Sequence, residues 1–304
     1  MKFIVTGGAG FIGNNIVRQL LRHRHDVTVV DNLHSGKLDN LTDLGDMIEF
    51  KKIDILNVDE LKKLVRTTDG VFHEAALTVV QESYQKREEY WKVNVRGTEN
   101  ILKLANDIGF KVVFASSSSV YGNVTKIPIK ENFERHPINP YGQTKLEDEH
   151  LAEKFHELGV KVIGLRYFNV YGEKQNPAYA GVITKFMERI RGRLPPIIYG
   201  DGSQIRDFIY VKDVAEANIK AMMGPTDFGF FNIGSGNTVS IKQLAQMMIR
   251  SSRLDIDPIY EKTLDGDIKA SKADTSLAKE TLLWKSTKRL QDWFDETIPN
   301  NLST

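Results

Sequence analysis

Short apolar runs alternate with longer segments of helical periodicity over the first 166 residues of the chain. This alternation is typical of a parallel sheet whose two faces are covered by helices. Six runs bounded by turn residues are predicted as strands, at 2–6, 26–31, 48–53, 70–74, 111–116 and 161–166. The predicted fold class is therefore α/β, with a doubly wound parallel sheet of the Rossmann type.

Apolar spacing and helix-end signals predict three helices between those strands. One begins near Phe11 and presents an apolar face, and a second covers roughly 88–107. The third begins at Pro140, which suits the first turn of a helix, with Asn139 as its N-cap.

The pattern becomes irregular after Arg166, with loops rich in Gly, Pro and Asn. Helices are predicted near 180–192, 211–223, 240–250 and 286–298, and Ser240 with Gln243 forms a capping box at the third of them. We expect a smaller α/β lobe at the carboxyl edge of the sheet, where open parallel sheets bind ligands. The predicted division is residues 1–166 with about 206–234 for the Rossmann domain, and about 167–205 with 235–304 for a substrate-binding lobe.

Charge and composition exclude several classes of function. The 41 basic and 40 acidic residues leave a net charge near +1 without a basic tract, so neither nucleic acid nor a membrane surface is expected as a partner. The chain has no cysteine, which excludes disulfides and thiolate chemistry, and its seven histidines are scattered, so no metal is predicted. No apolar run approaches the ~18 residues of a spanning helix, and a cytoplasmic protein is expected.

A glycine-rich loop joins the first predicted strand to the first helix. Its glycines permit a tight turn and a close approach to a pyrophosphate, and the strand-loop-helix context is the one that a dinucleotide site requires. The spacing differs by one residue, in its first interval, from the commoner dehydrogenase pattern. The predicted cofactor contacts in this loop are Gly7, Gly10, Phe11, Ile12 and Gly13.

Carboxylates after the second and third strands refine the predicted cofactor. Asp31, followed by Asn32, can accept hydrogen bonds from both ribose hydroxyls and would repel a 2′-phosphate, which favours NAD over NADP. Asp54, followed by Ile55, could take the adenine amino group or could simply be a solvated loop carboxylate. The loop after the fourth strand has side chains small enough to pass beside the dinucleotide, at Ala75 and Ala76.

Tyr141 and Lys145 lie four residues apart on the third predicted helix and therefore share one face. A phenol with an ordinary pKa near ~10 is a poor base at neutral pH, and a nearby cation makes the phenolate accessible. The run 116–119 puts four serines at the end of the fifth strand, where a hydroxyl could bind a substrate oxygen beside that phenol. Two or three of these serines are expected only to satisfy turn backbone.

Ten motifs in chain order carry a family resemblance that extends almost to the C-terminus. They are Thr6–Gly13, Asp31–Leu33, Asp54–Ile55, His73–Ala76, Asn94–Thr98, Ala115–Gly122, Tyr141–Lys145, Leu165–Gly172, Arg206–Val211 and Gly266–Asp267. The chain resembles the extended short-chain dehydrogenases/reductases of the nucleotide-sugar epimerase and dehydratase group, most closely the UDP-glucose 4-epimerases.

The resemblance implies a catalytic triad of Ser117, Tyr141 and Lys145, with Asn94 holding the site, and it implies that Asn94, Tyr141 and Lys145 also contact the cofactor. It implies epimerisation at C4 of a nucleotide-diphosphate hexose of the UDP-hexose type through a 4-keto intermediate. Phe168 would position the nicotinamide or the hexose, or would serve only the core. The implied substrate contacts are Ser117, Ser118, Tyr141, Phe168, Asn169, Arg206, Asp267 and Ser271.

Departures from the family pattern bear on the substrate. The resemblance implies that Asn169 and Arg206 contact the substrate diphosphate. Leu264 stands where a further arginine is usual, so either Lys262 or Lys269 replaces that contact or the substrate differs there. Ser271 stands where a large tyrosine narrows the hexose pocket, so a 2-acetamido group is expected to fit. The 4,6-dehydratase branch needs an Asp-Glu pair where this chain has Ser118 and Ser119.

Other functions share some of these features. A uronate epimerase or decarboxylase would keep every cofactor motif, and an NAD-sensing regulator would keep the glycine loop but lose the Tyr141–Lys145 pair. A structural scaffold would have no reason to keep Asp31 with the glycines. The resemblance also implies a homodimer that pairs through helices at about 88–107 and 140–158.

Overall fold

Seven parallel strands form one twisted sheet at the centre of the protein. The computed structural model describes residues 1–175, 181–263 and 269–302. The strand order is β11-β6-β5-β4-β1-β2-β3, with every neighbouring pair parallel. The strands are β1 (Lys2–Thr6), β2 (Asp26–Val30), β3 (Glu49–Lys51), β4 (Gly70–His73), β5 (Lys111–Ser117), β6 (Val162–Tyr167) and β11 (Phe228–Ile233). The doubly wound α/β prediction and all six predicted strands are confirmed.

The seventh strand, β11, is missing from the predicted strands. Its residues Phe228–Ile233 pair with Val162–Tyr167 of β6, and this pairing joins segments that are distant in the sequence. It enters the sheet through helix α8 (Val211–Met223), which crosses over from the β6 region and returns the chain parallel to β6.

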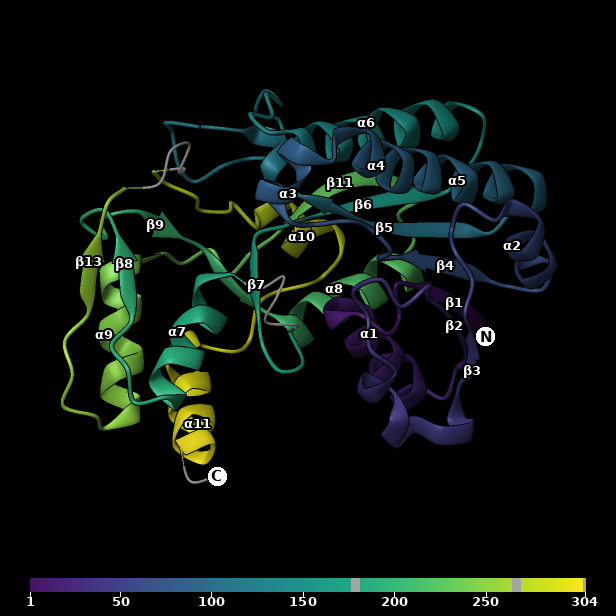
Figure 1. Cartoon of the computed structure of the whole chain (residues 1–304). Coiled ribbons are helices and arrows are strands. Elements are labelled where there is room, and N and C mark those ends of the chain that lie inside the picture. The colour runs from purple at the N-terminus through teal and green to yellow at the C-terminus, as the bar shows by residue number, and fades with distance from the viewer. Residues whose placement is uncertain (176–180, 264–268, 303–304) are drawn as a thin grey trace.

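Helices cover both faces of the sheet (Figure 1). One apolar cluster joins the sheet to α1 (Phe11–Arg22) and α8 and includes Ile16 and Val214, while a second joins it to helices on the other face and includes Leu102 and Phe155. The helices of the second face are α2 (Val58–Val65), α5 (Gly97–Ile108) and α6 (Pro140–Glu157). The two faces leave the carboxyl ends of the strands open at one edge.

The predicted helix at 88–107 is present but interrupted by a π-helical turn. It consists of α4 (Arg87–Tyr90), the π turn η3 (Trp91–Arg96) and α5, and the short helix α3 (Val80–Gln85) precedes it. Such turns frequently occur at functional sites, and this one carries Asn94.

A smaller group of elements lies beside the carboxyl edge of the sheet (Figure 1). Its apolar cluster includes Phe186, Leu244 and Phe294. Its helices are α7 (Val182–Arg191), α9 (Ile241–Ser252) and α11 (Leu290–Leu302), and its strands pair as β7 (Asn169–Tyr171) with β10 (Phe208–Tyr210), β8 (Ile197–Tyr199) with β13 (Ile259–Glu261), and β9 (Ile205–Arg206) with β12 (Val239–Ser240). Short helices complete the chain as η1 (Leu38–Asn40), η2 (Thr42–Met47), η4 (Ser118–Tyr121) and α10 (Ser276–Thr281).

The starts of two helices can be compared with the starts that the sequence predicted. The capping box of Ser240 and Gln243 is confirmed at α9. The last helix, predicted from 286, begins only at Leu290, and the backbone N–H groups of Thr287 and Lys288 just before it donate to the Asp213 carboxylate. Within the described residues no helix is long and apolar enough to cross a membrane.

Candidate active site

A cavity of about 550 Å³ opens at the carboxyl edge of the sheet. Its volume lies within the usual range for small-molecule sites. It brings together the glycine loop, the ends of β2, β4 and β5, and the first turns of α6. The predicted residues that line it are Gly7, Gly10, Phe11, Ile12, Gly13, Asp31, Asn32, Asp54, Ile55, Ala75, Ala76, Ser117, Tyr141, Lys145, Phe168 and Asn169.

The glycine loop forms a tight cradle that fits a pyrophosphate. Gly7 has a φ of +67°, and a Cβ on Gly13 would lie only 2.2 Å from the Gly7 carbonyl oxygen. No side chain caps the N-terminus of α1, and its first turn has no acidic residue. Phe11, Ile12 and Gly13 of that turn line the cavity, and an uncapped helix N-terminus at a cavity is the arrangement that binds the phosphates of a dinucleotide.

Asp31 holds the end of β2 against this loop. Its side chain is only 7% exposed, and its two oxygens accept hydrogen bonds from Ala9 N (3.0 Å) and Leu33 N (2.7 Å). Burial raises the pKa of Asp31, and the two backbone donors oppose that rise. Each carboxylate oxygen retains an acceptor site for a ribose hydroxyl. Asn32 donates to Asp54 at 2.9 Å, which ties the two predicted cofactor contacts together.

Helix α6 presents the predicted acid–base pair to the cavity. Asn139 caps it by accepting from Gly142 N at 2.8 Å, as predicted. A Cβ on Gly142 would lie 2.8 Å from the Ser119 carbonyl oxygen, so the helix packs closely on the serine turn. Tyr141 is half-buried and Lys145 is 4% exposed, and both line the cavity.

The four serines after β5 have different partners. Ser117 Oγ accepts a hydrogen bond from Ser119 N at 3.1 Å, so its own O–H remains able to donate into the cavity. Ser116 Oγ instead donates to Glu149 at 2.6 Å. Ser118 lies in η4 and is absent from the cavity lining among the described residues.

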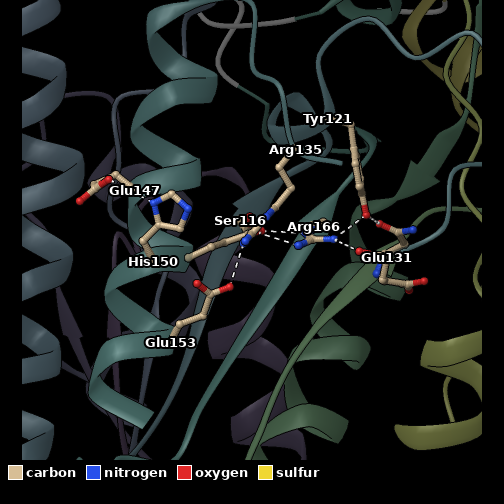
Figure 2. Close-up of polar contacts among 10 residues, drawn as sticks. Ser116, Tyr121, Glu131, Arg135, Glu147, His150, Glu153 and Arg166 are labelled. Carbon is tan, nitrogen blue, oxygen red and sulfur yellow. Dashed lines mark hydrogen bonds and ion pairs between the residues drawn. The ribbon is translucent and has the colours of Figure 1, made fainter. Parts of the chain in front are cut away.

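A buried polar network behind the cavity fixes the position of α6. Glu149, one turn after Lys145, is fully buried and accepts two hydrogen bonds from Arg166 of β6. Figure 2 shows Arg166 between Ser116 on one side and Glu131 on the other. The network therefore joins the helix that carries Tyr141 and Lys145 to two neighbouring strands.

Asn94 lies behind the site rather than in the cavity lining. It is fully buried, donates to Leu77 O and Thr144 Oγ1 at 3.0 Å each, and accepts from Leu77 N at 2.8 Å. These contacts join the loop after β4 to α6.

Two acidic residues of the site were not predicted from the sequence. Glu74 follows β4, lines the cavity and accepts from Tyr167 Oη at 2.9 Å, and burial raises its pKa to about 8. Asp148 is fully buried on α6 with its Oδ2 at 3.1 Å from Lys145 Nζ. The spacing of three residues from Lys145 was visible in the sequence, but the burial of the carboxyl was not.

The predicted substrate contacts divide between two cavities. Asn169 lines the first cavity and also a second one of about 570 Å³, which Arg206 and Tyr199 line as well. Ser271 is buried, donates its N–H to Ile205 O at 3.1 Å, and lines neither cavity in the part of the chain described. Asp267 and Leu264 lie outside the described residues.

Comparison with known proteins decides the family. Residues 3–234 match the model of the NAD dependent epimerase/dehydratase family. The chain belongs to the NAD-dependent epimerase/dehydratase family. This membership confirms the predicted family and the predicted NAD cofactor, and the glycine cradle and Asp31 fit that cofactor.

Several members of the family are similar to this chain over nearly their whole length. The solved UDP-glucose 4-epimerase from Thermotoga maritima with UDP-glucose is 36% identical, with a TM-score of 0.93 and coverage of 98% of this chain and 97% of that one. The UDP-N-acetylglucosamine 4-epimerase from Methanobrevibacter ruminantium in complex with UDP-N-acetylmuramic acid is also 36% identical, with a TM-score of 0.92 and coverage of 99% and 97%. A UDP-N-acetyl-alpha-D-glucosaminuronate decarboxylase from Bacillus cytotoxicus is 35% identical, with coverage of 98% and 96%. Overall similarity therefore does not by itself choose the reaction within the family.

Proposed function

We propose that this protein is an isomerase that epimerises C4 of a nucleotide-diphosphate hexose of the UDP-glucose and UDP-galactose type, with NAD as its cofactor. The observation that carries the proposal is that Ser117, Tyr141 and Lys145 line one cavity together with the glycine loop and Asp31. A general base, a hydrogen-bond donor and a cation thus lie beside a dinucleotide cradle.

Each catalytic side chain has a separate role. Bound NAD supplies the acceptor, and then the donor, of a hydride. Tyr141 Oη takes the proton of the C4 hydroxyl and later returns it, while Ser117 Oγ–H donates to the same oxygen. Lys145 places a positive charge beside Tyr141. Burial lowers the pKa of Lys145, and its interaction with Tyr141 is one of the effects that raise that pKa.

The second cavity is proposed to anchor the nucleotide end of the substrate. Arg206 is suited to diphosphate oxygens, and the Tyr199 ring offers a stacking surface for a base. Asn169 lines both cavities and would lie at the junction of the diphosphate and the hexose. An anchor away from the reacting carbon lets the 4-keto sugar rotate and receive hydrogen on its other face.

The charges near Tyr141 favour a neutral hexose over a uronate. Lys145 is the only lysine or arginine among the described residues that line the first cavity, and it is ion-paired with Asp148. A uronate carboxylate would therefore lack a second cation. Dehydration is disfavoured because Ser118 and Ser119 replace the acid–base pair that it needs.

Four finer features belong to the proposal. The Methanobrevibacter ruminantium relative supports acceptance of 2-acetamido hexoses. Residues 1–166 with about 206–234 would bind NAD, and about 167–205 with 235–304 would bind the nucleotide sugar.

We infer a homodimer that pairs through α5 and α6, which sedimentation analysis would test. A cytoplasmic location is inferred from the cofactor and substrate class.

Incubation with a panel of UDP-, GDP- and dTDP-sugars, followed by NMR analysis of the products, tests the function. The proposal predicts inversion at C4 of a UDP-hexose with unchanged mass. Loss of water or of carbon dioxide would contradict it.

A further inference from the structure

Asp148 is a buried carboxylate in direct contact with the proposed catalytic lysine. It lies three residues after Lys145 on the same face of α6 and is fully buried. Its Oδ2 lies 3.1 Å from Lys145 Nζ, and Lys145 itself is nearly buried. The pair is therefore shielded from water, and Lys145 lines the cavity.

The other oxygen of this carboxyl lacks a partner. Asp148 Oδ1 is buried without a hydrogen-bond partner. The Thr98 hydroxyl on α5 is near this carboxyl and is one of the groups that lower its pKa. That hydroxyl donates its single proton to Asn94 O at 2.7 Å. A buried acceptor without a donor is costly, so the Lys145 ammonium is the group that compensates Asp148.

The other charged and titratable groups around the pair have different roles. Glu149 of the same helix is held by Arg166. His73 at the end of β4 makes contacts to Thr6 and Thr98, and burial together with Lys145 lowers its pKa to about 3, so it is neutral. Glu74 and Tyr141 also interact with the Lys145 charge.

We propose that Asp148 is a positioning residue whose carboxylate keeps the Lys145 ammonium charged and in place, and that it thereby sets the alkaline limit of catalysis. The inference rests on the proposed function of Tyr141 and Lys145.

Burial and charge pairing act in opposite directions on this lysine. Burial by itself lowers the pKa of a lysine, because a charged form without water is costly. For Lys145 that cost is outweighed by Asp148 first and by Tyr141 next, and the pKa of Lys145 is raised. Lys145 therefore stays protonated as pH rises until its raised pKa is reached. Asp148, whose pKa burial raises to about 6, is ionised over the neutral range.

Asp148→Asn tests the proposal, because it removes the charge and keeps the shape. Activity of the NAD-bound enzyme on its nucleotide sugar is measured across pH. The alkaline fall in kcat should move down by at least about one pH unit, which lowers kcat by ~10-fold at pH values above both alkaline limits, with KM changed by less than ~2-fold. Glu147→Gln, one residue away and ion-paired with His150 on the exposed face, is the matched control and should keep the wild-type profile.

A direct titration separates this proposal from the proposed function. Nitrogen-15 NMR of the Lys145 ammonium, assigned with Lys145→Met, should show a lower Lys145 pKa in Asp148→Asn whether or not the protein is an epimerase. If Asp148→Asn fails to fold, Asp148→Ala replaces it, and Asp148→Glu should restore most of the alkaline range. An unchanged lysine titration and an unchanged alkaline fall in a folded variant would overturn the proposal.

Discussion

Arg166 donates two parallel hydrogen bonds to the Glu149 carboxylate, from Nε to Oε1 and from Nη2 to Oε2, each at 2.8 Å. Both side chains are almost fully buried, and the pair joins β6 to α6 one turn beyond Lys145. The helix that carries the proposed acid–base groups is therefore fixed to the sheet by a bidentate ion pair.

Breaking this pair from one side should destabilise the protein strongly. Arg166→Met leaves the Glu149 charge buried without its main partner, and we expect unfolding free energy measured in urea to fall by ~3–5 kcal/mol. The double variant Arg166→Met/Glu149→Leu removes both charges and should recover most of the loss. A single variant that loses less than about 1 kcal/mol would show that Ser116 and Arg135 hold Glu149 adequately.

Removing the proposed base should abolish turnover and spare cofactor binding. Tyr141→Phe deletes one oxygen and little volume, and we expect kcat to fall by at least ~100-fold, the low end of a general-base contribution. NAD retention, followed by absorbance of the purified protein, should match the wild type because the glycine loop is untouched. Near-normal turnover would mean that another group takes the C4 proton.

Asp31 should govern both the affinity for NAD and the discrimination against NADP. Asp31→Asn removes the negative charge and one of the two acceptors that hold Ala9 N and Leu33 N. We expect NAD to bind about tenfold more weakly, a loss of ~1.4 kcal/mol, and the preference over NADP to shrink by a similar factor. Calorimetric titration with both nucleotides measures this, with Asp26→Asn, exposed at the start of the same strand, as the control. An unchanged NAD-to-NADP ratio would remove Asp31 from the ribose site.

Glu74 should make the nucleotide-free protein less stable as pH rises. Its pKa is about 8 in the folded protein and 4.5 ordinarily, so between these values the unfolded chain is ionised while the folded one keeps its proton. Folding stability that is present below about pH 4.5 is thus lost as pH rises to about 8. Glu74→Gln removes this dependence, and its gain over wild type should grow by at least ~1.4 kcal/mol between about pH 5 and pH 9, since one pKa unit is worth that much.

Thermal unfolding at several pH values measures the Glu74 effect. Glu60→Gln, an exposed carboxyl on α2, is the control. A gain for Glu74→Gln that stays constant across pH would mean that Glu74 is already ionised in the folded protein at neutral pH.

Local signals predicted the elements that form the cofactor site. The strand before Gly7 and the helix from Pro140 have clear apolar runs and end signals, with Asn139 capping the helix as expected. By contrast, β11 was missed, and α11 starts later than predicted, at Leu290. The pairing with β6 defines β11, and Asp213 accepts hydrogen bonds from the backbone just before α11. Contacts between residues distant in sequence decided these two cases.

Contacts between residues distant in the sequence also limited the prediction of the candidate site. Spacing put Tyr141 and Lys145 on one face, and the structure brings both to the cavity with Ser117. The roles of Asp148 and Glu74 depend on burial, which the sequence around a single carboxylate does not reveal. Ser118 and Ser271 were expected at the substrate, but neither lines a cavity among the described residues, and their substrate contacts remain predictions.

Conversion of UDP-glucose deuterated at C4 tests the central claim most directly. Tyr141 would take only the hydroxyl proton, whereas the C4 deuterium would leave and return within one site without exchanging with water. We predict UDP-galactose that retains the deuterium at C4 and has unchanged mass, with conversion by Tyr141→Phe at least ~100-fold slower. Exchange of the C4 deuterium with solvent, or a product altered at another carbon, would contradict the account.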